Sequence, residues 1–306
     1  MRVPTLTLYG DLKNNVNFTR DKFADKQLQL STGQRFLHRS EEPATASEIA
    51  KIEQQMRDTD QYLKNVETAT QWAKVTNGKN QEVIDIMAKI TEELSSANNA
   101  THPPQYRVDI GSTVNNLLEQ LVQISESRIG DTYLFSGTNT SQPPFTVTRD
   151  ANGMITSVAY NGDANTEKRE TQFDDNTVVS YGELGGGTDG LFEATANNID
   201  LMNHLVTVRD ELSAGRIPAT ADMQLVDDDL EHVIGKLTAN GVQQQWFENQ
   251  EMSLQKIQAS QTDLLGDKKG LDMARGMIEL TELQTSLEAS LQMIGQTSRM
   301  SVLNYI

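Results

Sequence analysis

A repeat of apolar residues at alternating steps of three and four runs from residue 49 to residue 94 of this 306-residue chain. A seven-residue repeat of this length predicts an α-helix that packs along a coiled-coil seam. Pro43 suits the first turn of such a helix, and Thr45 with Glu48 has the spacing of a capping box. The apolar positions of the repeat are Ile49, Ile52, Met56, Leu63, Val66, Ala73, Ile84, Met87 and Leu94.

A second seam of the same period occupies the C-terminal part of the chain, from residue 273 to residue 305. The last 27 residues contain only three charged side chains, Glu282, Glu288 and Arg299. An isolated helix in water would carry more charge, so we expect this face to be covered by other helices. Its apolar positions are Met273, Met277, Leu280, Leu287, Leu291, Ile294 and Tyr305.

The first helix is expected over residues 6–34, ending at Gly33, and it is rich in polar residues. Such a helix is marginal alone and needs a partner. Residues 1–40 carry a net charge of +4 and residues 261–306 a net charge of −2, so the two ends can lie side by side without repulsion. The apolar positions of the first helix are Leu12, Val16, Phe23 and Leu30.

Helical spacing also marks three inner stretches, whereas residues 139–194 differ. The inner helices are expected through residues 110–124, 201–212 and 223–257, and the first carries Ile110, Val114, Leu117, Leu121 and Ile124 on one face. Residues 145–147, 155–160 and 178–181 have strand composition, and Asn-Gly pairs at 152–153 and 161–162 are hairpin signals. We interpret the glycines at 185–187 as a flexible loop.

The predicted fold is therefore mainly α: long antiparallel helices or a coiled coil, with paired N- and C-terminal helices and a small β-rich inserted domain. The predicted domains are a terminal coiled coil (1–42 with 265–306), a helical bundle (43–138 with 195–264) and an outer β-rich insert (139–194). The chain runs outward and returns, so its termini are expected to be neighbours.

Composition excludes several classes of function. The net charge of −17 argues against general nucleic-acid binding, which needs clustered Lys and Arg. The absence of cysteine excludes disulfides, thiolate metal sites and cysteine nucleophiles. The longest uninterrupted apolar run has three residues, too few for membrane insertion or for the apolar core of a cleaved signal peptide.

Candidate chemical sites are better explained as ordinary structure. The acidic residues at 227–229 lack the glycine and terminal glutamate of a calcium-binding loop, so we interpret them as a solvent-exposed helix face. The four histidines lack metal-ligand spacing, so we interpret them as surface or packing residues. We interpret Trp72 and Trp246 as helix-packing residues. The sequence therefore predicts no catalytic, cofactor-binding or metal-binding residues, no cofactor, and no enzymatic activity.

Two segments resemble a known family. Residues 28–46, LQLSTGQRFLHRSEEPATA, are similar to the N-terminal signature of flagellins and flagellar junction proteins. Residues 128–145, RIGDTYLFSGTNTSQPPF, resemble the stretch in which hook–filament junction proteins leave their helical core. The charge-poor C-terminus resembles the same family, whereas Phe36–Arg39 is bulkier than the usual turn at that place.

The resemblance implies a structural subunit of the bacterial flagellum that self-assembles as a ring joining the hook to the filament. The implied partners are further copies of the chain, a neighbouring hook-associated junction protein, flagellin, and a cytoplasmic export chaperone that binds the C-terminal helix. The location would be extracellular, reached through flagellar export without a cleaved signal peptide.

The residues expected to form the self-assembly and partner seam come from both terminal helices. They are Leu12, Val16, Phe23, Leu30, Met277, Leu280, Leu287, Leu291, Ile294 and Tyr305. Filament flagellin itself is the first alternative, and a flagellin-like protein with an enzymatic insert is a remote one.

Overall fold

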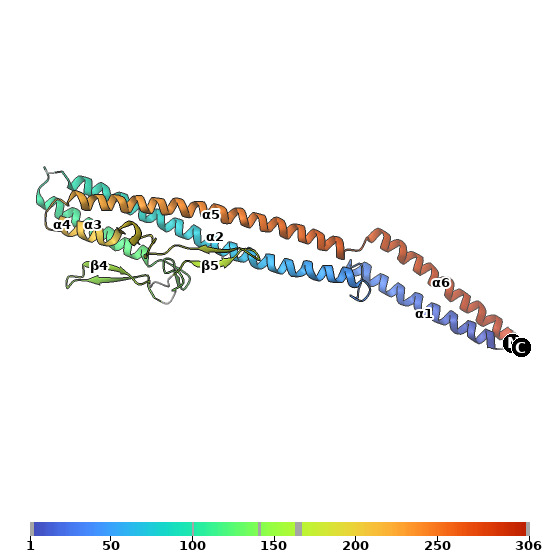
Figure 1. Cartoon of the computed structure of the whole chain (residues 1–306). Coiled ribbons are helices and arrows are strands. Elements are labelled where there is room, and N and C mark those ends of the chain that lie inside the picture. Colours follow the sequence, from blue (N-terminus) through green and yellow to red (C-terminus); the bar gives the residue numbers. More distant parts are fainter. Residues whose placement is uncertain (1–2, 100, 140–141, 163–166, 304–306) are drawn as a thin grey trace. The chain divides into compact units, whose positions relative to one another are not determined.

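The computed structural model describes residues 3–99, 101–139, 142–162 and 167–303 (Figure 1). The chain divides into two compact units. Unit 1 contains residues 1–58 and 256–306, and unit 2 contains residues 59–255. The two longest helices, α2 (Pro43–Ala97) and α5 (Thr220–Lys269), supply residues to both units. Residues 139–194, predicted as an outer insert, fall within unit 2.

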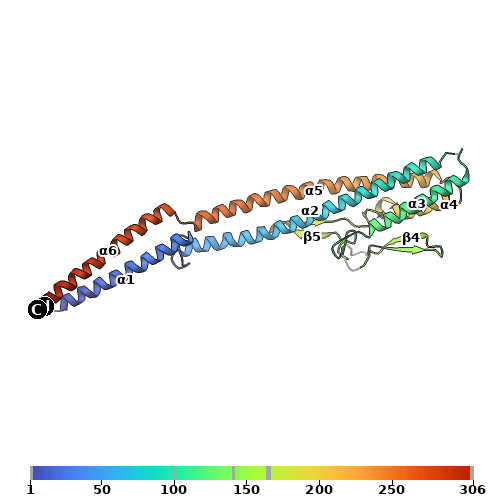
Figure 2. The ribbon, with the colours of Figure 1, turned by 180° about the vertical axis from the view of Figure 1, so that it is seen from behind.

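Unit 1 is built around two antiparallel helices, α1 (Val3–Thr32) and α6 (Met273–Leu303), which lie side by side in Figures 1 and 2. Gly33 ends α1 with a φ of +68°, a left-handed conformation that glycine adopts at little cost. The predicted pairing of the N- and C-terminal helices is therefore confirmed. The predicted capping box of α2 is wrong, because the Thr45 hydroxyl donates to Glu42 and not to the backbone.

Unit 2 contains a dense helical core. Helices α3 (Pro104–Ser125) and α4 (Leu201–Ser213) pack against each other, and parts of α2 and α5 run alongside them. The predicted apolar face of α3 is confirmed: Ile110, Val114, Leu117, Leu121 and Ile124 are all buried. On α2 the predicted seam is buried at Leu63, Val66, Ala73, Met87 and Leu94, whereas Ile84 is only half-buried.

Short strands connect α3 to α4. The described residues form four two-stranded antiparallel sheets, β1–β2, β3–β4, β5–β6 and β7–β8. The predicted strands 155–160 and 178–181 have the expected bounds, and the predicted strand 145–147 extends to residue 149. Strand β5 and the four two-residue strands β1, β2, β7 and β8 were not predicted. The elements are β1 (Arg128–Ile129), β2 (Thr132–Tyr133), β3 (Phe145–Arg149), β4 (Ile155–Tyr160), β5 (Arg169–Gln172), β6 (Val178–Tyr181), β7 (Glu193–Ala194), η1 (Thr195–Asn197) and β8 (Ile199–Asp200).

The β segment shares its core with the helices. Phe192 meets Phe135 and Phe145 edge to face at ring distances of 5.4 and 5.6 Å, and all three belong to the hydrophobic cluster that includes α3 and α4. A Cβ placed on Gly185 would lie 2.7 Å from the Phe145 ring. The interpretation of residues 185–187 as a flexible loop is therefore wrong, since the chain there needs glycine for close packing.

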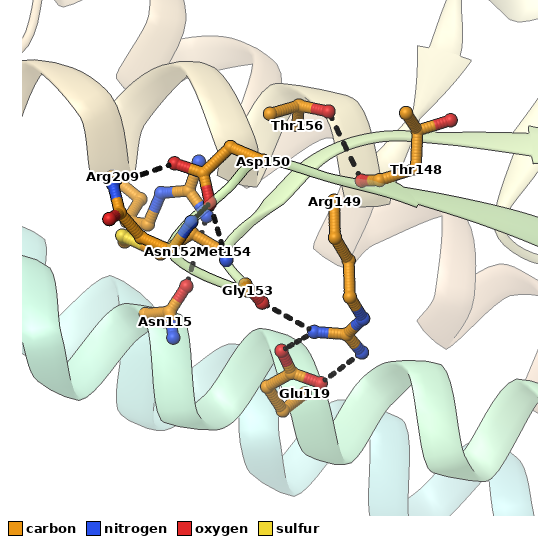
Figure 3. A network of polar contacts seen from close by, with 10 residues as sticks. All are labelled: Asn115, Glu119, Thr148, Arg149, Asp150, Asn152, Gly153, Met154, Thr156 and Arg209. Carbon is orange, nitrogen blue, oxygen red and sulfur yellow. Dashed lines mark hydrogen bonds and ion pairs between the residues drawn. The ribbon is translucent and has the colours of Figure 1, made fainter.

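Polar contacts fix the β3–β4 hairpin on α3 (Figure 3). The Arg149 guanidinium donates to Glu119 of α3 at 2.8 Å and to the Gly153 carbonyl of its own turn at 3.0 Å. This hydrogen bond to Arg149 holds the pKa of Glu119 below its ordinary value. Arg209 of α4, buried to 2% exposure, donates to the Asn115 side chain at 2.9 Å. The hairpin and α4 are thus tied to the same helix.

The acidic run at 227–229 is not a wholly solvated face. Asp229 is fully buried, and its carboxylate contacts the Nδ1 atom of half-buried His204 at 2.8 Å. Burial raises the pKa of Asp229, and the hydrogen bond to Asp229 raises the pKa of His204. The predicted packing role is confirmed for His204, and also for Trp72, whose ring centroid lies 6.2 Å from that of Tyr181.

Candidate assembly surface

The facing sides of α1 and α6 follow the coiled-coil rule. On each helix one set of half-buried or buried positions advances by alternating steps of four and three, as a heptad seam requires. On α1 they are Leu12, Val16, Thr19, Phe23, Lys26 and Leu30. On α6 they are Gly276, Leu280, Leu283, Leu287, Ser290 and Ile294.

Two contacts set the register of this pair. Lys26 forms an ion pair with Glu279 at 2.7 Å, and the hydrogen bond from Lys26 holds the pKa of Glu279 below its ordinary value. One turn away, a Cβ on Gly276 would lie 2.9 Å from a Leu30 methyl carbon. Glycine at position 276 therefore lets the two helices approach closely where α6 begins.

The seam residues predicted from the sequence separate into three groups. Seven lie on the facing sides: Leu12, Val16, Phe23, Leu30, Leu280, Leu287 and Ile294. Met277 and Leu291 are 63% and 52% exposed and point away from α1. Tyr305 lies outside the described residues. The participation of all ten in self-assembly stays a prediction.

The phase of the α6 seam differs from the predicted one by about one residue at two places. Gly276 and Ser290 occupy the facing positions, and their neighbours Met277 and Leu291 are turned by about 100°. Leu283, which is not among the predicted seam residues, is half-buried in the seam. A count of apolar residues passes over Gly and Ser, although small residues are what a close helix contact requires.

The outer faces of α1 and α6 carry large apolar side chains in water. Large exposed apolar surfaces mark protein–protein contact sites in soluble proteins. We call this set the outer apolar face: Phe18, Leu28, Met273, Met277, Ile278 and Leu291, each 48–63% exposed.

Backbone hydrogen bonds join the two non-helical segments of unit 1, the one that follows α1 and the one that precedes α6. Gln34 and Gly270 form an antiparallel bridge, with the Arg35 amide donating to the Lys269 carbonyl at 3.0 Å. The Leu271 amide donates to the Gly33 carbonyl at 2.9 Å. These bonds fix the point at which α1 and α6 leave the rest of unit 1.

Ion pairs and a small groove complete this junction. Lys268 and Lys269 bind Glu48 and Glu53 of α2 at 2.7 and 3.0 Å, and these hydrogen bonds hold the pKa of both carboxyl groups below the ordinary value. A groove of about 130 Å³ is lined by Gln34, Phe36, Leu37, Arg39, Ala46, Ile49, Ala50, Glu53 and Lys269.

The described residues contain neither a metal-binding cluster nor a membrane-spanning helix. Within them, no group of three or more His, Cys, Asp or Glu side chains is arranged to hold a metal ion. None of the described helices combines the length and apolarity needed to cross a membrane.

Comparison with known proteins gives this surface a context. Residues 3–140 match the family model of the bacterial flagellin N-terminal helical region. This match confirms the predicted resemblance to flagellins. The chain is 20% identical to flagellar hook-associated protein 3 of Escherichia coli over 309 residues, covering 97% of this chain and 93% of that protein.

Two further comparisons address the filament alternative and the fold. A flagellar filament core protein of Treponema maltophilum is 21% identical over 88% of this chain and 86% of its own length. The crystal structure of flagellar hook-associated protein 3 from Legionella pneumophila superposes with a TM-score of 0.56 at 12% identity, covering 72% of this chain and 98% of that structure. At this identity the superposition establishes a shared fold.

Proposed function

We propose that this chain is a structural subunit of the bacterial flagellum that joins the hook to the filament. The observation that carries the proposal is the antiparallel α1–α6 pair, whose inner seam is half-buried and whose outer apolar face is 48–63% exposed. The near full-length similarity to hook-associated protein 3 supports a junction role over a filament role.

The inner seam and the outer face have different tasks in this proposal. Leu280, Leu287 and Ile294 hold α6 against α1, whereas Met277 and Leu291 contact neighbouring subunits. A ring of such subunits buries the outer face between copies, and its two rims contact a neighbouring hook-associated junction protein and flagellin. The role is mechanical and needs no bound cofactor.

Before assembly the same outer face needs protection. We propose that a cytoplasmic export chaperone binds α6, because an amphipathic helix in an apolar groove is a common recognition mode. The protein is then exported to the flagellum through the flagellar secretion apparatus. Truncation before Leu271 is expected to abolish chaperone binding, measured by titration calorimetry, and an unchanged affinity would place the binding site elsewhere.

A deletion strain tests the junction role. Without the gene, cells are expected to build hooks and to release flagellin monomers into the medium, as seen by electron microscopy and immunoblotting. Long filaments made by the purified protein alone would instead establish the filament alternative. Normal filaments on the deletion strain would refute both roles.

Two substitutions separate the inner seam from the outer face. Leu287→Asp places a carboxylate in the α1–α6 seam, and so it is expected to lower monomer helicity in circular dichroism. Leu291→Asp places the same charge on the outer face, and so it is expected to leave helicity unchanged but to leave hooks without filaments.

Gln284→Asp is the matched control, because position 284 lies on α6 and is exposed. It adds the same charge outside both apolar sets and is expected to support swimming. A Leu291→Asp strain that swims normally would overturn the assignment of the outer face to assembly.

A further inference from the structure

The apolar packing of unit 2 is interrupted at one level of the α2–α5 pair. On α2 the buried apolar residues stop at Ala73 and resume at Val83, and on α5 they stop at Val233 and resume at Phe247. On α5 the two sides of this gap belong to separate hydrophobic clusters, whereas on α2 Trp72 and half-buried Val75 still contact the cluster that contains Val83. Cohesion by apolar burial is therefore weakest at this level.

Amide side chains fill the gap. The Asn240 side chain, 8% exposed, donates to the Ala73 carbonyl at 3.1 Å and to the Asn77 side-chain oxygen at 2.9 Å. Asn77 in turn donates to the Gln244 side chain at 2.6 Å. The helices are thus joined here by directional hydrogen bonds, which can exchange partners, and not by interlocking apolar side chains.

Each of these asparagines is followed by a glycine in the interior of a long helix. A Cβ on Gly78 or on Gly241 would meet nothing within 4 Å, so close packing does not require glycine at either position. Neither glycine has a positive φ. Glycine weakens a helix relative to alanine, and it is a frequent site of helix bending.

We propose that Asn77, Gly78, Asn240 and Gly241, the Asn-Gly layer, form a bend point within unit 2. Two glycines at one level let both helices bend together, and the amide contacts preserve the helix pairing while they do so. The asparagines contact each other across the two helices, and each is followed by a glycine that packing does not require.

One side of the bend point is bridged by the chain around β6. The Gln243 side chain donates to the Ser180 carbonyl at 2.8 Å, and Asn80 donates to the buried Glu183 carboxyl at 2.9 Å. Tyr181 packs against both hydrophobic clusters. These contacts restrict bending on that side and favour motion on the opposite one.

Spin labels on α2 measure the bending directly. The chain has no cysteine, so Lys64→Cys and Lys89→Cys, both at exposed positions on either side of the layer, accept nitroxides without competition. In a straight helix they lie about 37 Å apart, within range of pulsed electron resonance. The distance distribution is expected to be broad in the parent and narrower in Gly78→Ala/Gly241→Ala.

Gly235→Ala is the matched control, because Gly235 also lies in α5 with open space around its Cα but outside the layer. It is expected to leave the distribution unchanged. Equal widths in the parent and the double variant would overturn the proposal, and so would equal narrowing by the control.

A second pair of substitutions tests the amide contacts. Asn77→Leu/Asn240→Leu joins the two apolar clusters and is expected to narrow the same distribution. Amide hydrogen exchange gives an independent reading: each glycine replacement is expected to slow exchange at residues 74–82 or 237–245 about fivefold. Unchanged exchange in both helices would show that the layer is already rigid.

Discussion

Units 1 and 2 contain helices of similar composition but differ in how they bury apolar side chains. In unit 2, Phe135, Phe173 and Phe192 are almost wholly enclosed. In unit 1 the α1–α6 seam is only half-buried at its leucines, and large apolar side chains of both helices face water. In an isolated pair of helices, each helix buries only the face that contacts its partner.

The contrast indicates that unit 2 completes its own core, whereas unit 1 leaves large apolar side chains of both its terminal helices exposed. Apolar burial is the main source of stability, so the local free energy of unfolding is expected to be much lower in unit 1. The predictions below test that difference, beginning with the largest effect.

Limited proteolysis is expected to show the largest difference. Trace protease should cut the soluble monomer within residues 1–40 and 268–306, because the opening of a helix pair with a half-buried seam costs little. Cleavage within unit 2 is expected to be slower by orders of magnitude, and the ends are expected to become resistant after assembly. Mass spectrometry of the first fragments locates the cuts. Equal resistance of both units in a verified monomer would remove the distinction between them.

Removal of one core ring is the next largest effect. Phe173 is fully buried between Trp246 and Phe247, at ring distances of 5.6 and 5.4 Å. Phe173→Ala is expected to lower the free energy of unfolding by about 3–5 kcal/mol, measured by urea denaturation. Phe18→Ala, at a side chain 60% exposed on α1, is expected to change it by about 0.5 kcal/mol or less. Similar losses from the two variants would contradict the packing difference.

A pH dependence confined to unit 2 is a smaller effect. The pKa of His204 lies above its ordinary 6.5, so the folded state retains this proton longer than the unfolded state. The stabilisation is complete below pH 6.5 and is lost as the pH rises through the folded-state pKa. Because burial raises the pKa of Asp229, that carboxyl contributes in the same direction.

Thermal unfolding of unit 2 is therefore expected to shift to lower temperature as the pH rises above 6.5. His204→Gln is expected to flatten this dependence, measured by near-ultraviolet circular dichroism. A steeper decline in the variant than in the parent would refute the role of the His204–Asp229 pair.

The Arg149–Glu119 pair is expected to contribute least. Its side chains are 41% and 29% exposed, so solvent screens the charges. A double-mutant cycle with Arg149→Ala and Glu119→Ala is expected to give a coupling of about 0.2–1 kcal/mol, measured by urea denaturation. A coupling of several kcal/mol would mean that the hairpin supports the core of unit 2 mainly through this contact.

Periodicity predicted the helices well because it records which side of a helix is buried. The α3 face from Ile110 to Ile124 and the four apolar α1 positions are as expected. The phase of α6 was missed because Gly276 and Ser290 contribute to a seam through their small size, to which a count of apolar residues is blind.

Contacts between distant residues were beyond a reading of local pattern. Asp229 stands in a run of acids, and only the fold brings His204 to it from another helix. Strand β5, with the polar sequence RETQ, is a strand because β6 pairs with it. Gly185 needs its lack of a side chain because Phe145, forty residues earlier, lies against it.

The bridge between Gln34 and Gly270 has a mechanical consequence. In the proposed flagellar role the joints of the subunit are under tension, and unit 1 has two joints where helix gives way to extended chain. The two joints are hydrogen-bonded to each other, so neither can lengthen alone. Tension at Leu271, just before α6, is transmitted to Gly33, just after the C-terminal end of α1. The two chain ends of unit 1 therefore share a load as one double-stranded tether.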